Sequence, residues 1–155
     1  MEKTERDDSF DLSMLVDQLF IHEGCSLDPY SDHLGYLTIG VGRCLDKKGI
    51  SEEEAMILLM NDIDEVAGQL DRNIPWWREL DDVRQRVLLD MAFNVGAWGL
   101  MKFRKFLTHL QGGRYNSAAN EMLNSKWAGQ VKGRATALAQ MMRTGQDYIK
   151  SPEQD

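Results

Sequence analysis

The segment 27–43 constrains the fold of this chain most, because its composition differs from that of the sequence on either side. It reads LDPYSDHLGYLTIGVGR, is rich in Gly, Tyr, Thr and Ile, and has turn signals at Asp28-Pro29 and at His33-Leu34-Gly35. Such a composition favours two or three short antiparallel strands. The chain after residue 50 has helical patterning instead. The sequence therefore predicts an α+β fold that is predominantly helical, with one small N-terminal antiparallel sheet.

A helical stripe precedes this segment and ends at an acidic residue. Three residues beyond the stripe comes Glu23, and Gly24 then supplies a stop signal. We expect this first helix to bury one face, with a carboxyl group at the end of that face, which is costly unless the group is paired or protonated. The stripe consists of Leu12, Leu15, Val16, Leu19 and Phe20.

Helices account for the rest of the chain. Ser51 and Glu54 form a capping box that opens a helix of about 20 residues, and Pro75 closes it or its loop. Asp82 is the expected cap of the next helix, whose apolar face runs over 83–95 and ends at Gly96. Shorter helices are expected over 101–111, 115–123 and 134–148. We interpret 1–155 as a single domain, with a flexible N-terminus (1–11), a first helix, sheet and connecting helix (12–72), a helical lobe (73–148) and a tail (149–155).

Charge is distributed unevenly along the chain. Residues 1–82 hold 7 Lys/Arg and 20 Asp/Glu, a net charge of −13, whereas residues 83–155 hold 11 and 5, a net charge of +6. The basic C-terminal part either faces a polyanion or carries scattered solvated cations. It lacks a recognition motif with base-reading side chains, so we expect no nucleic-acid partner.

The sequence offers no sign of a metal, a cofactor or a membrane span. Cys25 and Cys44 lack zinc-site spacing, and we expect free thiols, with a bridge between them as the alternative. No phosphate-binding Gly-rich loop opens a helix, so no cofactor is assigned. Apolar runs are too short to cross a bilayer, and the acidic first ten residues are unlike a secretory signal, so we expect a cytoplasmic chain.

Glu23 and Asp32 form a candidate catalytic pair. Glycoside hydrolysis needs two carboxyl groups in different environments, one that donates a proton and one that stays ionised. A helix C-terminus and loss of solvent both raise a carboxyl pKa, which makes Glu23 the expected acid. Asp32 lies in a polar turn that water reaches, and it is the expected base. Taken alone, such a pair is more often two surface charges.

The segment from Glu23 to Gly42 resembles the catalytic segment of phage-type lysozymes, glycoside hydrolase family 24. The spacing Glu-x8-Asp-x5-Thr is similar to that family's triad and falls here on Glu23, Asp32 and Thr38. The resemblance implies a lysozyme-like fold, in which a long helix joins the sheet lobe to a helical lobe. It also implies a muramidase that hydrolyses peptidoglycan with inversion, Asp32 activating a water that Thr38 positions.

Weaker landmarks extend the resemblance over about 12–148. The resemblance makes Asn94, Tyr30 and Trp127 candidate residues of the cleft or its surroundings, and it brings Arg134 close to Glu23. Where the family often has a His paired with an Asp, this chain has Arg43, for which Asp62 is the expected partner. Core packing is the expected role of the remaining tryptophans, Trp76, Trp77 and Trp98.

Three alternatives remain open. A lytic transglycosylase needs only the acid, so Asp32 and Thr38 argue against it; a catalytically silent glycan-binding module and a nucleic-acid binder are the others. By resemblance, the enzyme is a monomer that acts on peptidoglycan glycan strands, does not insert into the membrane, and reaches the periplasm through a holin lesion at host lysis.

Overall fold

The computed structural model describes residues 9–148, so most of the predicted N-terminal extension and the whole predicted tail lie outside the described residues. The chain divides into two compact units, residues 1–56 and 57–155. The division falls inside one long helix. The prediction of a single domain over 1–155 stays a prediction.

The first unit contains one helix, a small sheet and a helical turn. Helix α1 spans Leu12–Glu23, and Asp11 caps it by accepting a hydrogen bond from the backbone N–H of Met14 at 3.0 Å. Strands β1 (Ser26–Ser31), β2 (Leu37–Gly40) and β3 (Arg43–Cys44) form an antiparallel sheet in the order β1-β2-β3. Helix α2 spans Leu45–Lys48. The predicted small N-terminal sheet is therefore confirmed.

Strand pairing places Thr38 in the centre of the sheet. Thr38 on β2 lies opposite Tyr30 on β1 and opposite Cys44 on β3. The β1–β2 ladder is irregular between Ser26 and Tyr30, as expected of a strand that contains Pro29, which has no backbone N–H to donate. Cys25 and Cys44 are both free thiols.

Helix α3, Glu52–Asn73, begins at the predicted capping box. The backbone N–H of Ser51 donates to Glu54 Oε1 at 3.0 Å, and that of Glu54 donates to Ser51 Oγ at 3.1 Å. These reciprocal bonds satisfy two of the N–H groups that a helix start leaves without partners. The helix ends before Pro75, as predicted.

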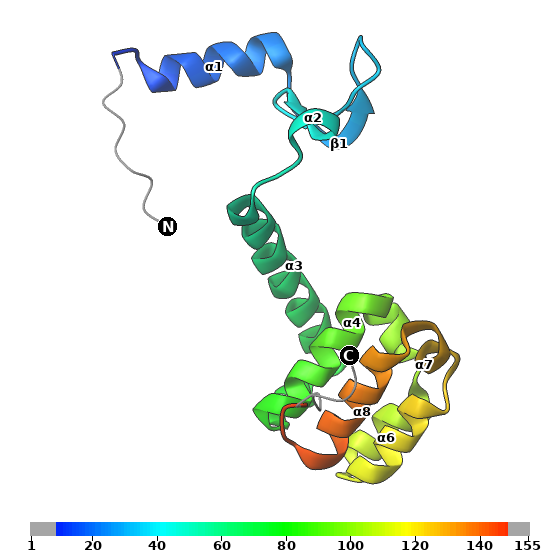
Figure 1. Cartoon of the computed structure of the whole chain (residues 1–155). Helices are drawn as coiled ribbons and strands as arrows, with labels where there is room; N and C mark the ends of the chain where they lie inside the picture. Colours follow the sequence, from blue (N-terminus) through cyan, green and yellow to red (C-terminus); the bar gives the residue numbers. More distant parts are fainter. Residues whose placement is uncertain (1–8, 149–155) are drawn as a thin grey trace. The chain divides into compact units, whose positions relative to one another are not determined.

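The second unit is an all-helical bundle in its described part (Figure 1). After the end of α3 come the 3-10 turn η1 (Trp77–Glu79) and the long helix α4 (Asp82–Met101). Shorter helices follow: α5 (Arg104–Gln111), α6 (Tyr115–Leu123), α7 (Lys126–Val131) and α8 (Gly133–Thr144). Their buried side chains, with the last turns of α3, form one hydrophobic core: Leu70, Ile74, Trp77, Val87, Leu88, Met91, Ala92, Leu100, Phe106, Leu110, Ala118, Ala119, Met122, Trp127, Ala135, Leu138, Ala139 and Met142.

Four predicted boundaries in this unit were wrong, one of them the start of α5, which lies at Arg104 and not at residue 101. The cap of α4 is Asp81, which accepts a hydrogen bond from the N–H of Arg84, and Asp82 is the first helical residue. Gly96 interrupts the helical geometry of α4 with φ 78° and ψ 160°, but helix resumes as far as Met101. Helix α8 ends at Thr144 because Gly145 adopts the left-handed conformation typical of a helix C-terminus.

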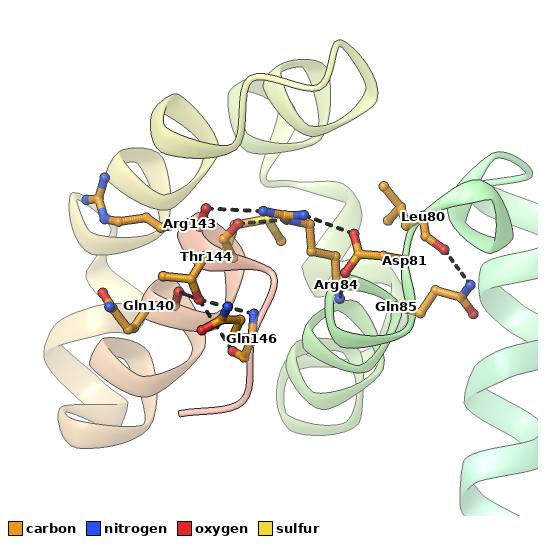
Figure 2. A network of polar contacts seen from close by, with 9 residues as sticks. Leu80, Asp81, Arg84, Gln85, Gln140, Arg143, Thr144 and Gln146 are labelled. Carbon is orange, nitrogen blue, oxygen red and sulfur yellow. Dashed lines mark hydrogen bonds and ion pairs between the residues drawn. The ribbon is translucent and has the colours of Figure 1, made fainter. Parts of the chain in front are cut away.

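Arg84 joins the start of α4 to the end of α8 (Figure 2). Its side chain donates to the carbonyl oxygens of Met142 at 2.8 Å and Arg143 at 3.1 Å, and to Asp81 Oδ1 at 3.0 Å. The guanidinium also lies 3.5 Å from the centre of the Tyr115 ring. Because the last carbonyls of a helix carry partial negative charge, a buried cation here stabilises the helix end.

Candidate functional site

Glu23 is the last residue of α1, and its carboxyl group lies against the turn between β2 and β3. Gly24 ends the helix with φ 69° and donates its N–H to Phe20 O at 3.0 Å. A Cβ added at Gly42 would be 2.6 Å from Glu23 Oε2 and 2.9 Å from its Cδ. Because Gly42 has no side chain, the carboxyl group of Glu23 can occupy the space beside it. Among the described residues, none donates a hydrogen bond to it.

The first unit does not bury the apolar stripe of α1, although the sequence predicts that one face of this helix is buried. Leu12, Val16, Leu19 and Phe20 are each between 40% and 49% exposed, and Glu23 is exposed as well. The physical reason is the small size of the sheet, whose three strands comprise only Ser26–Ser31, Leu37–Gly40 and Arg43–Cys44. Such strands offer too little apolar surface to cover a helix of 12 residues.

Asp32 opens the tight turn between β1 and β2. Its Oδ1 accepts hydrogen bonds from the backbone N–H groups of Leu34 at 2.8 Å and Tyr36 at 2.9 Å. The bond from Tyr36 is the largest cause that lowers the pKa of Asp32, ahead of the bond from Leu34 and the nearby charges of His33 and Lys47. The carboxylate is therefore ionised at neutral pH.

Thr38 follows Asp32 by six residues and is buried, with 4% of its surface exposed. Its hydroxyl donates to the carbonyl oxygen of Tyr36 at 3.0 Å. The backbone of Tyr36 therefore links the two side chains, since its N–H bonds to Asp32 and its carbonyl bonds to Thr38. With its proton used in this way, the hydroxyl oxygen of Thr38 has lone pairs that can accept a hydrogen bond from a water.

Tyr36 is a site residue that the sequence reasoning missed. The Lys47 ammonium lies 4.2 Å from the centre of its ring, a distance typical of a cation–π contact. The signal available in the sequence was the position of Tyr36 after Gly35, at the turn exit where an Asp side chain bonds back to the backbone. Tyr30 lies opposite Thr38 and is 37% exposed, which is compatible with its predicted place at a cleft.

Arg43 binds a different acid from the one predicted. Its Nη1 lies 2.8 Å from Glu54 Oε1 and donates to the carbonyl of Gly49 at 3.2 Å, so the expected pairing with Asp62 was wrong. Glu54 lies in the first turn of α3, and Asp62 comes eight residues later, about 12 Å along the helix. The capping box already holds Glu54 in place for Arg43.

Asn94 and Trp127 are in direct contact in the second unit. Trp127 Nε1 donates to Asn94 Oδ1 at 2.8 Å, and the Trp127 ring packs edge-on against Phe103. Trp127 is only 4% exposed, whereas Asn94 is exposed. Trp127 can therefore hold the Asn94 amide in place, but its ring faces are not open to a sugar.

Arg134 forms a two-point contact with Asp90. Its Nε donates to Asp90 Oδ1 at 2.8 Å and its Nη2 donates to the Asp90 carbonyl at 3.2 Å. Both side chains are 42% exposed. The predicted approach of Arg134 to Glu23 stays a prediction.

No group of three or more His, Cys, Asp or Glu side chains is arranged to hold a metal ion within residues 9–148. No helix in the same range is both long and apolar enough to span a bilayer.

Comparison with known proteins identifies the family of this chain, while the catalytic roles of Glu23, Asp32 and Thr38 stay predictions. The family model described as phage lysozyme matches residues 21–143, a span that contains all three. The chain belongs to the phage lysozyme family. The sequence resemblance is thereby confirmed, and so is the predicted fold class.

Three curated relatives of this family member are similar over most of the chain. It is 29% identical to the pre-baseplate central spike protein Gp5 of Enterobacteria phage T4, over 90% of this chain but only 29% of the length of that protein. It is 24% and 26% identical to the probable T4-type lysozymes 1 and 2 of Dictyostelium discoideum, in each case over 86% of this chain and 96% of the relative.

Proposed function

We propose that this chain is a muramidase, which hydrolyses the β-1,4 bond between N-acetylmuramic acid and N-acetylglucosamine in bacterial peptidoglycan. Membership of the phage lysozyme family supports a glycoside hydrolase with this class of substrate. The observation that carries the proposal is the contrast between two carboxyl groups. Asp32 receives two backbone hydrogen bonds that favour its charged form, whereas Glu23 receives none from the described residues.

In the proposed reaction, Glu23 donates its proton to the glycosidic oxygen as the bond to the anomeric carbon breaks. Asp32 accepts a proton from a water that attacks the anomeric carbon from the opposite face. Thr38 accepts a hydrogen bond from this water and fixes its orientation. This assignment of roles predicts inversion at the anomeric carbon, which requires the two carboxyl groups to stand about 6.5–9.5 Å apart.

The hydrogen bonds within the hairpin support these roles. The Tyr36 backbone fixes Asp32 and Thr38 relative to each other through bonds of 2.9 and 3.0 Å. Groups held in this way need little rearrangement when charge develops in the transition state. The open space at Gly42 gives Glu23 a defined place beside the same sheet.

The test compares three single substitutions on chloroform-permeabilised Gram-negative cells, with loss of turbidity as the measurement. Glu23→Gln and Asp32→Asn should each lower the rate by about 100-fold or more, since removing an acid or base typically costs 10²–10⁴. The amide oxygen of Asn can still accept the backbone bonds at position 32, so the hairpin should fold. Asp28→Asn removes an exposed β1 carboxylate and is the matched control, expected to keep full activity.

Lysis that survives Glu23→Gln would refute the proposal. Product analysis separates the remaining alternatives: anhydro ends identify a lytic transglycosylase, and glycan binding without cleavage by the wild-type chain identifies a silent module. Proton NMR of the first product formed reads the anomeric configuration, and retention would contradict the role of Asp32.

We further propose that the enzyme acts at host lysis as a monomer. In this proposal it stays in the host cytoplasm until a holin lesion admits it to the periplasm. Its support is the family resemblance alone. The check is lysis timing in cells that produce the chain with and without a holin.

A further inference from the structure

An exposed tryptophan lies beside a hollow in the second unit. Trp98 is 83% exposed, although core packing was its predicted role. Trp98 lies just after the break at Gly96, where φ is 78°, and its neighbours Ala97 and Leu100 take the buried positions of this last part of α4. An apolar ring of this size is seldom left in water without a partner, since burial of aromatic area is strongly favourable.

The hollow beside Trp98 has a volume of about 510 Å³, within the usual range for small-ligand sites. It lies where the end of α3, the end of α4 and one face of α5 come together. Trp76 and Leu107 line it and also pack against the hydrophobic core. The base of the hollow is therefore formed by apolar side chains that pack on the core, and one side of it is formed by the exposed Trp98 ring.

Polar groups line the rest of the hollow, and two of them have no side-chain partner among the described residues. The Arg104 guanidinium and the Gln111 amide make no side-chain hydrogen bond within residues 9–148. Asn73 uses its Nδ2 on Gln69 O at 2.9 Å, which leaves its Oδ1 as an acceptor. Thr108 uses its proton on Arg104 O at 2.9 Å, which leaves its oxygen as an acceptor.

This mixture of groups fits a saccharide ring. A pyranose has an apolar C–H face that suits an indole ring, and its rim of hydroxyls both donates and accepts hydrogen bonds. Arg104 and Gln111 supply donors, and Asn73, Thr108 and Gln111 supply acceptors. A lipid surface fits less well, because the indole borders a concave site with a single lining cation.

We propose that Trp98 and this hollow form a glycan-binding site on the second unit, which takes a pyranose ring of a peptidoglycan strand. The choice of peptidoglycan rests on the proposed function, whereas the saccharide class follows from the lining side chains. Such a site would raise the residence time of the enzyme on insoluble glycan.

The test uses the full chain carrying Glu23→Gln, so that glycan is not consumed. Chitotetraose is titrated while the indole N–H resonance of Trp98 is followed by NMR. This resonance is assigned as the one that disappears in Trp98→Phe. We expect a saturable shift of this resonance. Trp98→Ala should weaken binding to purified sacculi about three- to tenfold in a sedimentation assay, and Trp98→Phe less.

A charge-matched pair of substitutions controls for nonspecific attraction. Arg104→Gln should weaken binding to sacculi, whereas Lys105→Gln, at an exposed neighbour that does not line the hollow, should not. An unmoved Trp98 resonance, or equal binding by Trp98→Ala, would overturn the proposal. So would Trp98-dependent binding to anionic phospholipid vesicles with no effect on sacculi. Cleavage by the wild-type chain is measured separately, so failure of the proposed hydrolysis would be seen independently.

Discussion

Replacement of Arg84 by methionine removes the contact between the start of α4 and the end of α8 while keeping a long side chain. Arg84 is 9% exposed and donates to the carbonyls of Met142 and Arg143. A hydrogen bond from a charged group contributes about 1.5–3 kcal/mol, and a buried acceptor left without a donor costs about 1–3 kcal/mol. Because these contributions overlap, we expect a loss of about 3 kcal/mol in the free energy of unfolding.

Urea unfolding followed by far-ultraviolet circular dichroism measures this loss. The matched control is Arg86→Met, two residues along the same helix, which removes ion pairs to Asp82 and Asp147 from a side chain that is 44% exposed. Exposed pairs contribute little, so this change should cost less than about 1 kcal/mol. Arg84→Lys should fall between the two, since it keeps the charge but not the planar fork of donors. Equal losses for Arg84→Met and Arg86→Met would refute the reasoning.

Three further predictions concern other parts of the chain. Gly42→Ala places a Cβ 2.6 Å from Glu23 Oε2 and strains a backbone with φ 69°, so we expect kcat to fall about 100-fold with little change in KM; unchanged kcat would contradict the placement of Glu23. Arg43 and Ser51 lower the pKa of Glu54 from 4.5 to about 2. The contribution of Glu54 to the stability of the fold should therefore be complete above pH 4.5 and be lost as the pH falls toward 2. In acid unfolding curves, Glu54→Gln should abolish this pH-dependent loss. Asn94→Ala removes the acceptor for Trp127 Nε1 and should cost about 1 kcal/mol, whereas Asn94→Asp should keep stability in the same urea assay.

Local patterns in the sequence predicted those features that local chemistry decides. The capping box of Ser51 and Glu54, the end of α1 at Gly24 and the turn after Asp32 all depend on residues within five positions of one another. Each bond satisfies a backbone group that the neighbouring sequence leaves without a partner. The resemblance then gave Asp32 and Thr38 their roles, which periodicity alone did not.

Features that depend on the phase of a helix or on distant partners were missed. Trp98 lies just after the break at Gly96, where Ala97 and Leu100 take the buried positions. From the sequence, several acidic residues were possible partners for Arg43. The actual partner is Glu54, because the capping box holds its carboxylate near Arg43. The sequence also does not show which side chain lies against a glycine, as Glu23 lies against Gly42.

Helix α3 has a practical consequence for anyone who wishes to isolate the helical unit. The boundary between the units falls between Met56 and Ile57, yet α3 is one helix from Glu52 to Asn73. A fragment that starts at Ile57 would lose the capping box and expose four N–H groups at a new helix end. A fragment that starts at Ser51 keeps both reciprocal bonds. A fragment of the helical unit should therefore begin at Ser51, at the cap of α3, six residues before the second compact unit begins.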